Sequence, residues 1–351
     1  MTQRDQLKAA LFTLDQNPLS FERLALEIFQ FQYQNNEVYH TYVNSLNRDP
    51  SKIDRIEKIP FLPIEFFKSH PVISGNAVPQ LIFESSGTTG QMTSRHFVSD
   101  LPFYELLSRK TFERFYGPLS DYHIFALLPS YMERNNSSLV YMVQNFIFHT
   151  FSKASGFYLE NKKDLVLNMK KAANDKRKIL FIGVTFALLD LAEDEYLSSI
   201  LKTIGNRLIV METGGMKGKR KEMIREELHK VLCTSFGTTA IHSEYGMTEL
   251  LSQGYSKGNG YFNLPNSMKI LLREVNDPFT YLPRFKVGAV DQNVKYRGKT
   301  GGINVIDLAN IDSCSFVETK DLGSFSADYK SFNILGRFDN SDLRGCNLLV
   351  N

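Results

Sequence analysis

Residues 85–90 combine four hydroxyl side chains and two glycines directly after the apolar run 81–83. Glycines allow several backbone N–H groups to converge on one anion, and hydroxyls add donors for phosphate oxygens. The pattern favours a phosphate-binding loop, and an ordinary Ser/Gly turn is the alternative interpretation. It is not a Walker A loop, because residues 91–93 (Gln-Met-Thr) stand where that motif has Gly-Lys-Ser/Thr. The residues of this candidate loop are Ser85, Ser86, Gly87, Thr88, Thr89 and Gly90.

A second group of candidate residues lies in 243–249, which also follows a strand-like segment. Tyr245, next to Gly246 and Met247, offers an aromatic face on which a base can stack. Thr248 can donate a hydrogen bond to a phosphate, and Glu249 can bind Mg²⁺ as a hard oxygen ligand. The alternative is a loop with an incidental acid.

Two further stretches carry weaker signals. Gly214 and Gly215 follow a strand-like segment, and paired glycines let the backbone approach a flat ligand closely. A plain strand-to-helix turn is the alternative for them. Asp321 is followed later by Arg337, and a carboxylate paired with an arginine can grip the vicinal hydroxyls of a ribose.

The elements that must position these residues follow from hydrophobic periodicity. The predicted strands are 81–84, 123–129, 179–184 and 207–211, and the predicted helices are 100–115, 137–151, 161–175, 186–203 and 218–235. This alternation predicts an α/β domain with a largely parallel sheet. Ligands bind at the carboxyl ends of the strands in such sheets, and we expect residues 83–96 to lie there.

The pattern changes at both ends of this region. Beyond residue 243 we expect a smaller β-rich lobe with strands at 267–274, 301–307, 314–319 and 331–335. Apolar residues at helical spacing in 21–29 predict a helix near the start of the chain. The expected organisation is a helical segment 1–80 packed on the core, a core of 81–340, and a tail of 341–351.

Composition excludes several classes of protein. Net charge is +3 with acids and bases interleaved, so no nucleic-acid partner is expected. Cysteine occurs three times at irregular spacing, as Cys233, Cys314 and Cys346, which gives neither a disulfide framework nor a zinc site. No apolar run is long enough to span a membrane, and no apolar signal region follows Met1. We therefore expect a cytoplasmic protein with free thiols.

Taken in order, SSGTTG, TGG, YGMTE, KDLG and GRFD resemble the motifs of the adenylate-forming (ANL) superfamily, from about Phe83 to Asp339. Within that superfamily the chain resembles the acyl-protein synthetase (LuxE-type) family, the fatty-acid-activating components of bacterial fatty-acid reductase. The residues that carry this closer likeness are 64–70, 86–91 with 94–96, 128–131 with 137–139, and 342–348. The resemblance implies the large α/β domain of the superfamily, with parallel-sheet lobes and a smaller β-rich lobe.

The resemblance also implies a role for each candidate residue. Ser85 to Gly90 would hold the β- and γ-phosphates of ATP, and Glu249 would bind Mg²⁺. Tyr245 would stack on adenine, and Thr248 would contact the α-phosphate. Asp321 and Arg337 would hold the ribose, and residues 212–215 would line the adenine and acyl side.

Most superfamily members continue past the GRFD position into a mobile lid of about a hundred residues that carries a catalytic lysine. We expect this lid to be absent here, which draws attention to Cys346 in the tail. Seven residues after Asp339, it has an extended reach of roughly 23 Å, and neighbouring Arg344 should favour its thiolate. The reach and the expected thiolate character, like the resemblance, indicate Cys346 as an acyl acceptor. The alternative is an incidental thiol near the C-terminus.

The sequence therefore predicts an ATP- and Mg²⁺-dependent ligase that adenylates an apolar carboxylic acid and passes the acyl group to a protein cysteine. A reductase or acyltransferase would be its partner. One alternative is a ligase that uses coenzyme A or a carrier protein as acceptor. Another is a nucleotide-binding module without turnover.

Overall fold

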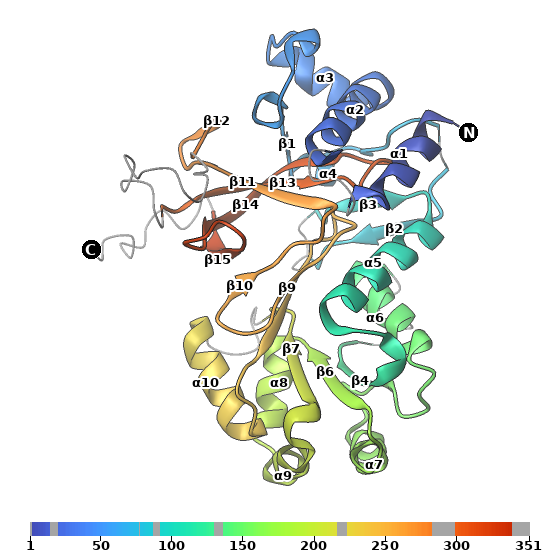
Figure 1. The fold of residues 1–351 in the computed structure, drawn as a ribbon, viewed down its shortest axis with the longest axis vertical. Helices are drawn as coiled ribbons and strands as arrows, with labels where there is room; N and C mark the ends of the chain where they lie inside the picture. The colour runs from blue at the N-terminus through green and yellow to red at the C-terminus, as the bar shows by residue number, and fades with distance from the viewer. Residues whose placement is uncertain are drawn as a thin grey trace. The chain divides into compact units, whose positions relative to one another are not determined.

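A computed structural model describes residues 2–14, 20–76, 78–86, 92–129, 136–215, 223–282 and 299–338 of the chain (Figure 1). The chain forms two compact units. One contains Met1–Val78 and Asn263–Asn351, and the other contains Pro79–Phe262. The expected segments 1–80, 81–340 and 341–351 remain a prediction, and each unit is described by itself.

A parallel sheet forms the centre of the Pro79–Phe262 unit. Its strand order is β5 (Gly156–Phe157), β4 (Tyr122–Leu127), β6 (Lys178–Gly183), β7 (Leu208–Glu212), β8 (His242–Tyr245) and β9 (Gly254–Ser256). Adjacent strands from β5 to β8 run parallel, and β9 pairs antiparallel with β8. Every residue of β4 is buried, as expected for a strand covered on both faces. The predicted strands at 123–129, 179–184 and 207–211 are confirmed to within two residues at their ends.

Helices cover both faces of this sheet. They are α5 (Leu101–Tyr116), α6 (Ser138–His149), α7 (Lys162–Ala173), α8 (Thr185–Ala192), α9 (Glu195–Ile204) and α10 (Arg225–Phe236). The predicted single helix 186–203 is wrong: the chain breaks at Asp194, whose side chain accepts the Leu197 N–H and caps α9. The predicted helix 218–235 begins only at Arg225, and residues 216–222 lie outside the described part.

The segment before the candidate phosphate loop differs from its prediction. Strand β2 (Leu81–Glu84) pairs antiparallel with β3 (Arg95–Val98) in a sheet of its own, so it is not part of the parallel sheet. The expectation that 83–96 follows a parallel strand is therefore wrong. The predicted strand itself is present, but Ile82 is exposed and only Phe83 is fully buried.

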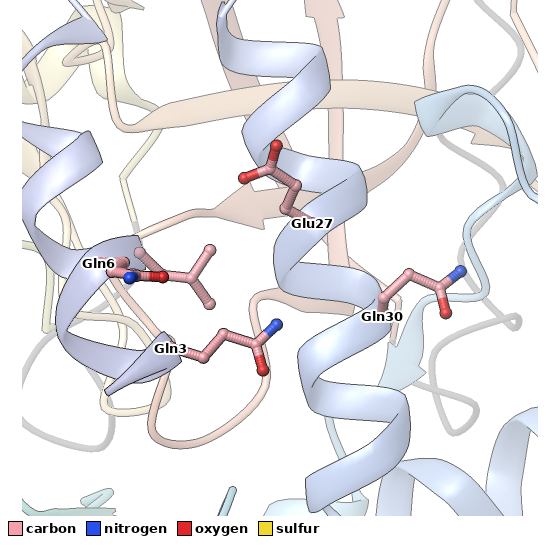
Figure 2. A pocket seen from close by; sticks show the side chains of 5 residues that line it. Gln3, Gln6, Glu27 and Gln30 are labelled. Atoms are coloured by element: carbon pink, nitrogen blue, oxygen red, sulfur yellow. The ribbon is translucent and has the colours of Figure 1, made fainter. Parts of the chain in front are cut away.

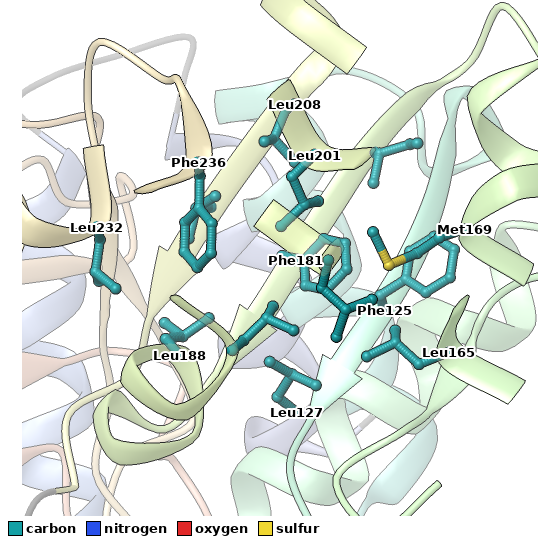
Figure 3. Packing of buried hydrophobic residues seen from close by; sticks show 14 of the residues in the cluster. Phe125, Leu127, Leu165, Met169, Phe181, Leu188, Leu201, Leu208, Leu232 and Phe236 are labelled. Carbon is teal, nitrogen blue, oxygen red and sulfur yellow. The ribbon is translucent and has the colours of Figure 1, made fainter. Parts of the chain in front are cut away.

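The core of this unit lies on one face of the parallel sheet, beneath α7 to α10. Phe125 of β4 and Phe181 of β6 are both fully buried, and their rings stack with centroids 5.2 Å apart and planes 8° apart. Figure 3 shows these rings among side chains from the covering helices, including Leu165, Leu188 and Leu232. On the other face, Phe112 of α5 packs against Tyr122 and Phe146.

The second unit contains an antiparallel sheet. Its strands are ordered β15 (Phe332–Arg337), β14 (Phe316–Phe325), β13 (Gly301–Asp307), β11 (Met268–Glu274) and β12 (Asp277–Tyr281), and β1 (Leu62–Pro63) pairs parallel with β14. The four predicted strands are present, although β14 extends beyond 319, and β12 was not predicted. The two-residue strand β10 (Tyr261–Phe262) belongs to the Pro79–Phe262 unit.

N-terminal helices α1 (Gln3–Leu11), α2 (Ser20–Asn35), α3 (Glu37–Ser45) and α4 (Phe66–Ser69) belong to this second unit. The predicted apolar face of 21–29 is buried in α2. Arg4 and Lys8 both form ion pairs with Asp312, and the side-chain amide of Gln32 donates to the carbonyl of Asn310 at 2.9 Å. These polar contacts join the first helices to residues more than 270 positions later in the chain.

We predict that Phe181→Ala lowers the free energy of unfolding by about 3–5 kcal/mol, because a stacked, fully buried ring leaves a cavity. Urea denaturation followed by circular dichroism measures this change. The control is Leu167→Ala on α7, where the side chain is 52% exposed and the change should stay within about 0.5 kcal/mol. Equal losses in the two variants would contradict the packing described for Phe181.

Candidate active site

The loop after β7 is held at the carboxyl edge of the parallel sheet. The N–H of Thr213 donates to the carbonyl of Gly183 at the end of β6, and the N–H of Thr185 donates to the carbonyl of Gly214 at 2.9 Å. Gly214 and Gly215 have φ values of +74° and +91°, a region that side chains rarely adopt. The two predicted glycines are therefore required by backbone conformation, whatever ligand they approach.

A buried carboxylate, Glu212, fixes the start of this loop. Its Oε2 accepts the Gly214 N–H at 2.7 Å, while Arg225 Nε and His229 Nε2 lie 3.8 and 3.9 Å from its Oε1. Burial alone would raise the pKa of Glu212, but the side chains of His229 and Ser243, the Gly214 N–H and the charge of Arg225 bring it below its usual value. The sequence resemblance placed Glu212 in the loop 212–215 that would line the adenine and acyl side, but it did not indicate that this carboxylate holds the loop through the Gly214 N–H.

The next strand along, β8, carries the stretch 243–249 to the same edge, because Glu212 is in register with Ser243. Tyr245 is 5% exposed; its ring lies 5.8 Å from that of Phe262, and its hydroxyl contacts the sulfur of Met247. Glu249 is buried and Thr248 partly buried, directly after this strand.

A histidine joins this stretch to the β2–β3 hairpin. His96 of β3 is buried, and its Nδ1 lies 2.8 Å from the carbonyl oxygen of Thr248, 152 positions later in the sequence. Ser85 closes the hairpin: its hydroxyl accepts the Ser94 N–H, and its own N–H donates to the Ser94 carbonyl. The structure therefore brings two predicted motifs together within one unit. Ser86 is exposed, while Gly87, Thr88, Thr89 and Gly90 lie outside the described residues.

A second carboxyl group, Glu244, lies beside the first. Burial and the negative charge of Glu212 raise the pKa of Glu244 to about 8, so it holds a proton at neutral pH. A β-carbon on Gly246 would collide with the Glu244 carboxyl group, which gives this predicted glycine a steric reason. Sequence reasoning missed Glu244, because its pKa depends on a neighbour that only the sheet brings close.

Asp321 and Arg337 meet in the other unit, as the sequence predicted. They are in register on β14 and β15, and Arg337 Nε donates to Asp321 Oδ1 at 3.0 Å. The backbone N–H of Asp321 donates to the hydroxyl of Thr319. Asp321 is 5% exposed, whereas the Arg337 side chain is 56% exposed, so the guanidinium is accessible to a ligand.

Cysteines in the described part are not activated as nucleophiles. Cys314 is fully buried, and burial raises the pKa of its thiol to about 12. Burial also raises the pKa of Cys233, which is partly exposed on α10. Cys346 lies outside the described residues.

Two hollows of about 300 and 320 Å³ contain none of the predicted site residues. Figure 2 shows the smaller, which is lined by Gln3, Gln6 and Leu7 of α1 and by Glu27 and Gln30 of α2. Arg225, His229 and Cys233 help to line the larger one. Among the described residues there is no cluster of three or more potential metal ligands, and no helix combines the length and apolar character needed to cross a membrane.

No protein-family model and no curated protein sequence matches this chain. Solved structures resemble its fold. A 2-hydroxyisobutyryl-CoA ligase in the postadenylation state, in complex with 2-HIB-AMP, has a TM-score of 0.60 and 12% identity, covering 91% of this chain and 68% of that one. A McyG A-PCP protein complexed with phenylalanyl-adenylate has a TM-score of 0.47 and 14% identity, covering 84% and 51%. A long-chain-fatty-acid-CoA ligase from Archaeoglobus fulgidus has a TM-score of 0.45 and 14% identity, covering 74% and 51%.

The chain therefore has the α/β fold of adenylate-forming ligases, as the sequence predicted. It spans 68% of the length of the first of these proteins and about half of the other two. At these identities the likeness concerns the fold alone.

We predict that Glu244→Gln removes a pH dependence of stability. Because the folded-state pKa of Glu244 is raised above 4.5, its contribution to stability is fully present at low pH and is lost as pH rises towards about 8. Between pH 5 and pH 8, the wild type should lose at least ~1.4 kcal/mol relative to the variant, the equivalent of one pKa unit. Urea denaturation of both proteins at the two pH values measures this, and parallel curves would contradict the raised pKa.

Proposed function

We propose that this protein is an ATP-dependent ligase that adenylates an apolar carboxylic acid and transfers the acyl group to the thiol of Cys346. The observation that carries the adenylation step is the hydrogen bond between His96 and the Thr248 carbonyl, because it joins the candidate phosphate loop to the stretch containing Glu249. The likeness of the fold to an acyl-CoA ligase bound to an acyl-adenylate supports the same reaction.

In the adenylation step, a carboxylate oxygen of the acid attacks the α-phosphorus of ATP. A new P–O bond forms, the bond to the β-phosphate breaks, and pyrophosphate leaves. Such a step needs positioned donors and charge neutralisation more than a protein nucleophile. The hydroxyls and backbone N–H groups of residues 85–90 would hold the β- and γ-phosphates, and the Thr248 hydroxyl would donate to the α-phosphate.

Glu249 fits a magnesium ion that is shared with the nucleotide. Mg²⁺ usually takes one or two carboxylates and completes its coordination with phosphate oxygens and water. A single buried acid at the end of this stretch is therefore enough for such a site. When bound, the ion would neutralise charge on the phosphates.

The remaining nucleotide contacts are those that the sequence resemblance implies. Tyr245, with the loop at Gly214 and Gly215, would line the adenine, and its tilted packing on Phe262 holds the ring in one orientation. Asp321 would accept hydrogen bonds from the ribose hydroxyls, and its hydrogen bond from Arg337 orients the carboxylate.

In the transfer step, the Cys346 thiolate attacks the carbonyl carbon of the acyl-adenylate. The C–S bond forms, the C–O bond to the phosphate breaks, and AMP leaves. The LuxE-type sequence resemblance and the raised thiol pKa values of Cys233 and Cys314 support Cys346 as the acceptor. A reductase or acyltransferase would then take the acyl group.

We predict acid-dependent exchange between ATP and labelled pyrophosphate, strongest with medium- or long-chain acids. Glu249→Gln should lower its rate by at least about a hundredfold, because the metal loses its protein carboxylate. Glu227→Gln, on the exposed side of α10, is the matched control and should leave the rate unchanged. ATP binding without exchange under any acid would instead identify a nucleotide-binding module without turnover.

A separate experiment tests the acceptor. Wild-type protein given a radiolabelled fatty acid and ATP should carry a hydroxylamine-labile label on a denaturing gel. Cys346→Ser should lose the label but keep pyrophosphate exchange, while Cys233→Ser keeps both. Label that survives in Cys346→Ser, or that appears only when coenzyme A or a carrier protein is added, would contradict transfer to Cys346.

A further inference from the structure

Two phenylalanine side chains project from the end of α6 in the Pro79–Phe262 unit. Phe148 is 68% exposed and Phe151 is 78% exposed, and their ring centroids lie 6.4 Å apart. A single exposed apolar side chain needs no explanation, but two neighbouring aromatic rings form a patch that water solvates poorly.

The backbone holds one of these rings outward in an unusual conformation. Phe151 has a φ of +51°, a region that is unfavourable for a bulky residue. Hydrogen bonds on both sides fix the turn: the Ser152 N–H donates to the Thr150 hydroxyl, and the Ser152 hydroxyl lies 2.6 Å from Nδ1 of His123. Surrounding contacts that over-determine a strained residue are typical of functional positions.

The surface around this turn is basic. Arg177 Nη1 donates to the carbonyl of Thr150, and His123 Nε2 lies 3.1 Å from Asp175, so residues 175–178 lie beside the turn. Three lysines in or next to these segments are exposed: Lys153, Lys176 and Lys178. Asp175, the acid in this segment, is ionised but paired: desolvation is outweighed by hydrogen bonds from Arg177, which lower its pKa to about 2, and the Arg177 guanidinium compensates its negative charge.

The turn lies at the end of the sheet where β4 and β6 begin, at Tyr122 and Lys178. In a parallel sheet this is the edge opposite to the one where β7 ends at Glu212 and β8 ends at Tyr245. A surface bound to the turn would therefore leave the candidate site of this unit open.

We propose that Phe148 and Phe151, with the three lysines, dock this unit on an anionic lipid bilayer. Aromatic rings on a rigid turn can enter the interfacial layer, and the lysine side chains can reach the phosphates of the headgroups. Charge complementarity selects this partner over a neutral apolar one. Such binding is reversible and depends on the fraction of anionic lipid. This inference goes beyond the proposed ligase activity and does not depend on it.

The chain contains no tryptophan, so Phe151→Trp introduces a single fluorescent reporter. Its emission should shift to the blue with phosphatidylcholine vesicles that contain phosphatidylglycerol as about a third of the lipid, and much less with phosphatidylcholine alone. Lys153→Glu and Lys176→Glu should each weaken binding by at least roughly fivefold. No shift with the anionic vesicles would overturn the proposal.

Flotation of otherwise unlabelled protein with the same vesicles provides the second measurement. The double variant Phe148→Ser, Phe151→Asn should stop floating while its thermal stability is kept, since asparagine tolerates positive φ. The control is Ile224→Ser, which removes a 62% exposed side chain at the start of α10 and should float like wild type. Flotation that persists in the double variant would overturn the proposal. The proposal would also be overturned if sedimentation shows that the wild type and the control are dimers and the double variant is not. A second copy of the chain would then cover the patch.

Discussion

The loops that follow β7 and β8 at the carboxyl ends of the parallel strands depend on the buried carboxylate of Glu212. A buried charge is stable only where partners replace the water it has lost, and here the Gly214 N–H, Arg225 and His229 supply them. The same negative charge acts on the next strand, where it helps to keep Glu244 protonated. Glu212 and Glu244 can therefore lie close together because only Glu212 is ionised. The surrounding groups compensate this one negative charge.

The hydrogen bond between His96 and the carbonyl of Thr248 holds together the segments that carry the proposed phosphate contacts. The hairpin has its own two-stranded sheet, so strand pairing does not tie it to the parallel sheet. A hydrogen bond to a backbone carbonyl instead holds β3 against the turn that carries Glu249. The proposed phosphate-binding groups of this unit therefore share one framework although they come from distant parts of the sequence, and positioned donors of this kind are what a phosphoryl-transfer step requires.

Much of the fold followed from hydrophobic pattern, because the strands around Phe125 and Phe181 are apolar except for His123 and Lys178, and the helices have one apolar face. The hydrophobic pattern along the chain gave wrong predictions where contacts with distant residues determine the local structure. The run at 81–84 is predicted to belong to the parallel sheet, yet it pairs antiparallel with β3 in a sheet of its own. The motif residues of the candidate site could be predicted from their order along the chain. The carboxyl pair and the strained turn at Phe151 could not, because a pKa and a positive φ arise from tertiary contacts.

The unit that contains the first helices is discontinuous in sequence, whereas Pro79–Phe262 is continuous. During synthesis on the ribosome, the central unit can complete its sheet and core as soon as it emerges. The first helices must wait much longer, because Arg4, Lys8 and Gln32 find their partners only when residues 310–315 have been made. Until then the parts of their apolar faces that pack on later strands, such as Phe29 and Tyr39 against Phe316, stay uncovered. During translation, the first helices are therefore the part of the chain that stays incompletely packed for longest. Chaperones that bind nascent helices would protect this segment most.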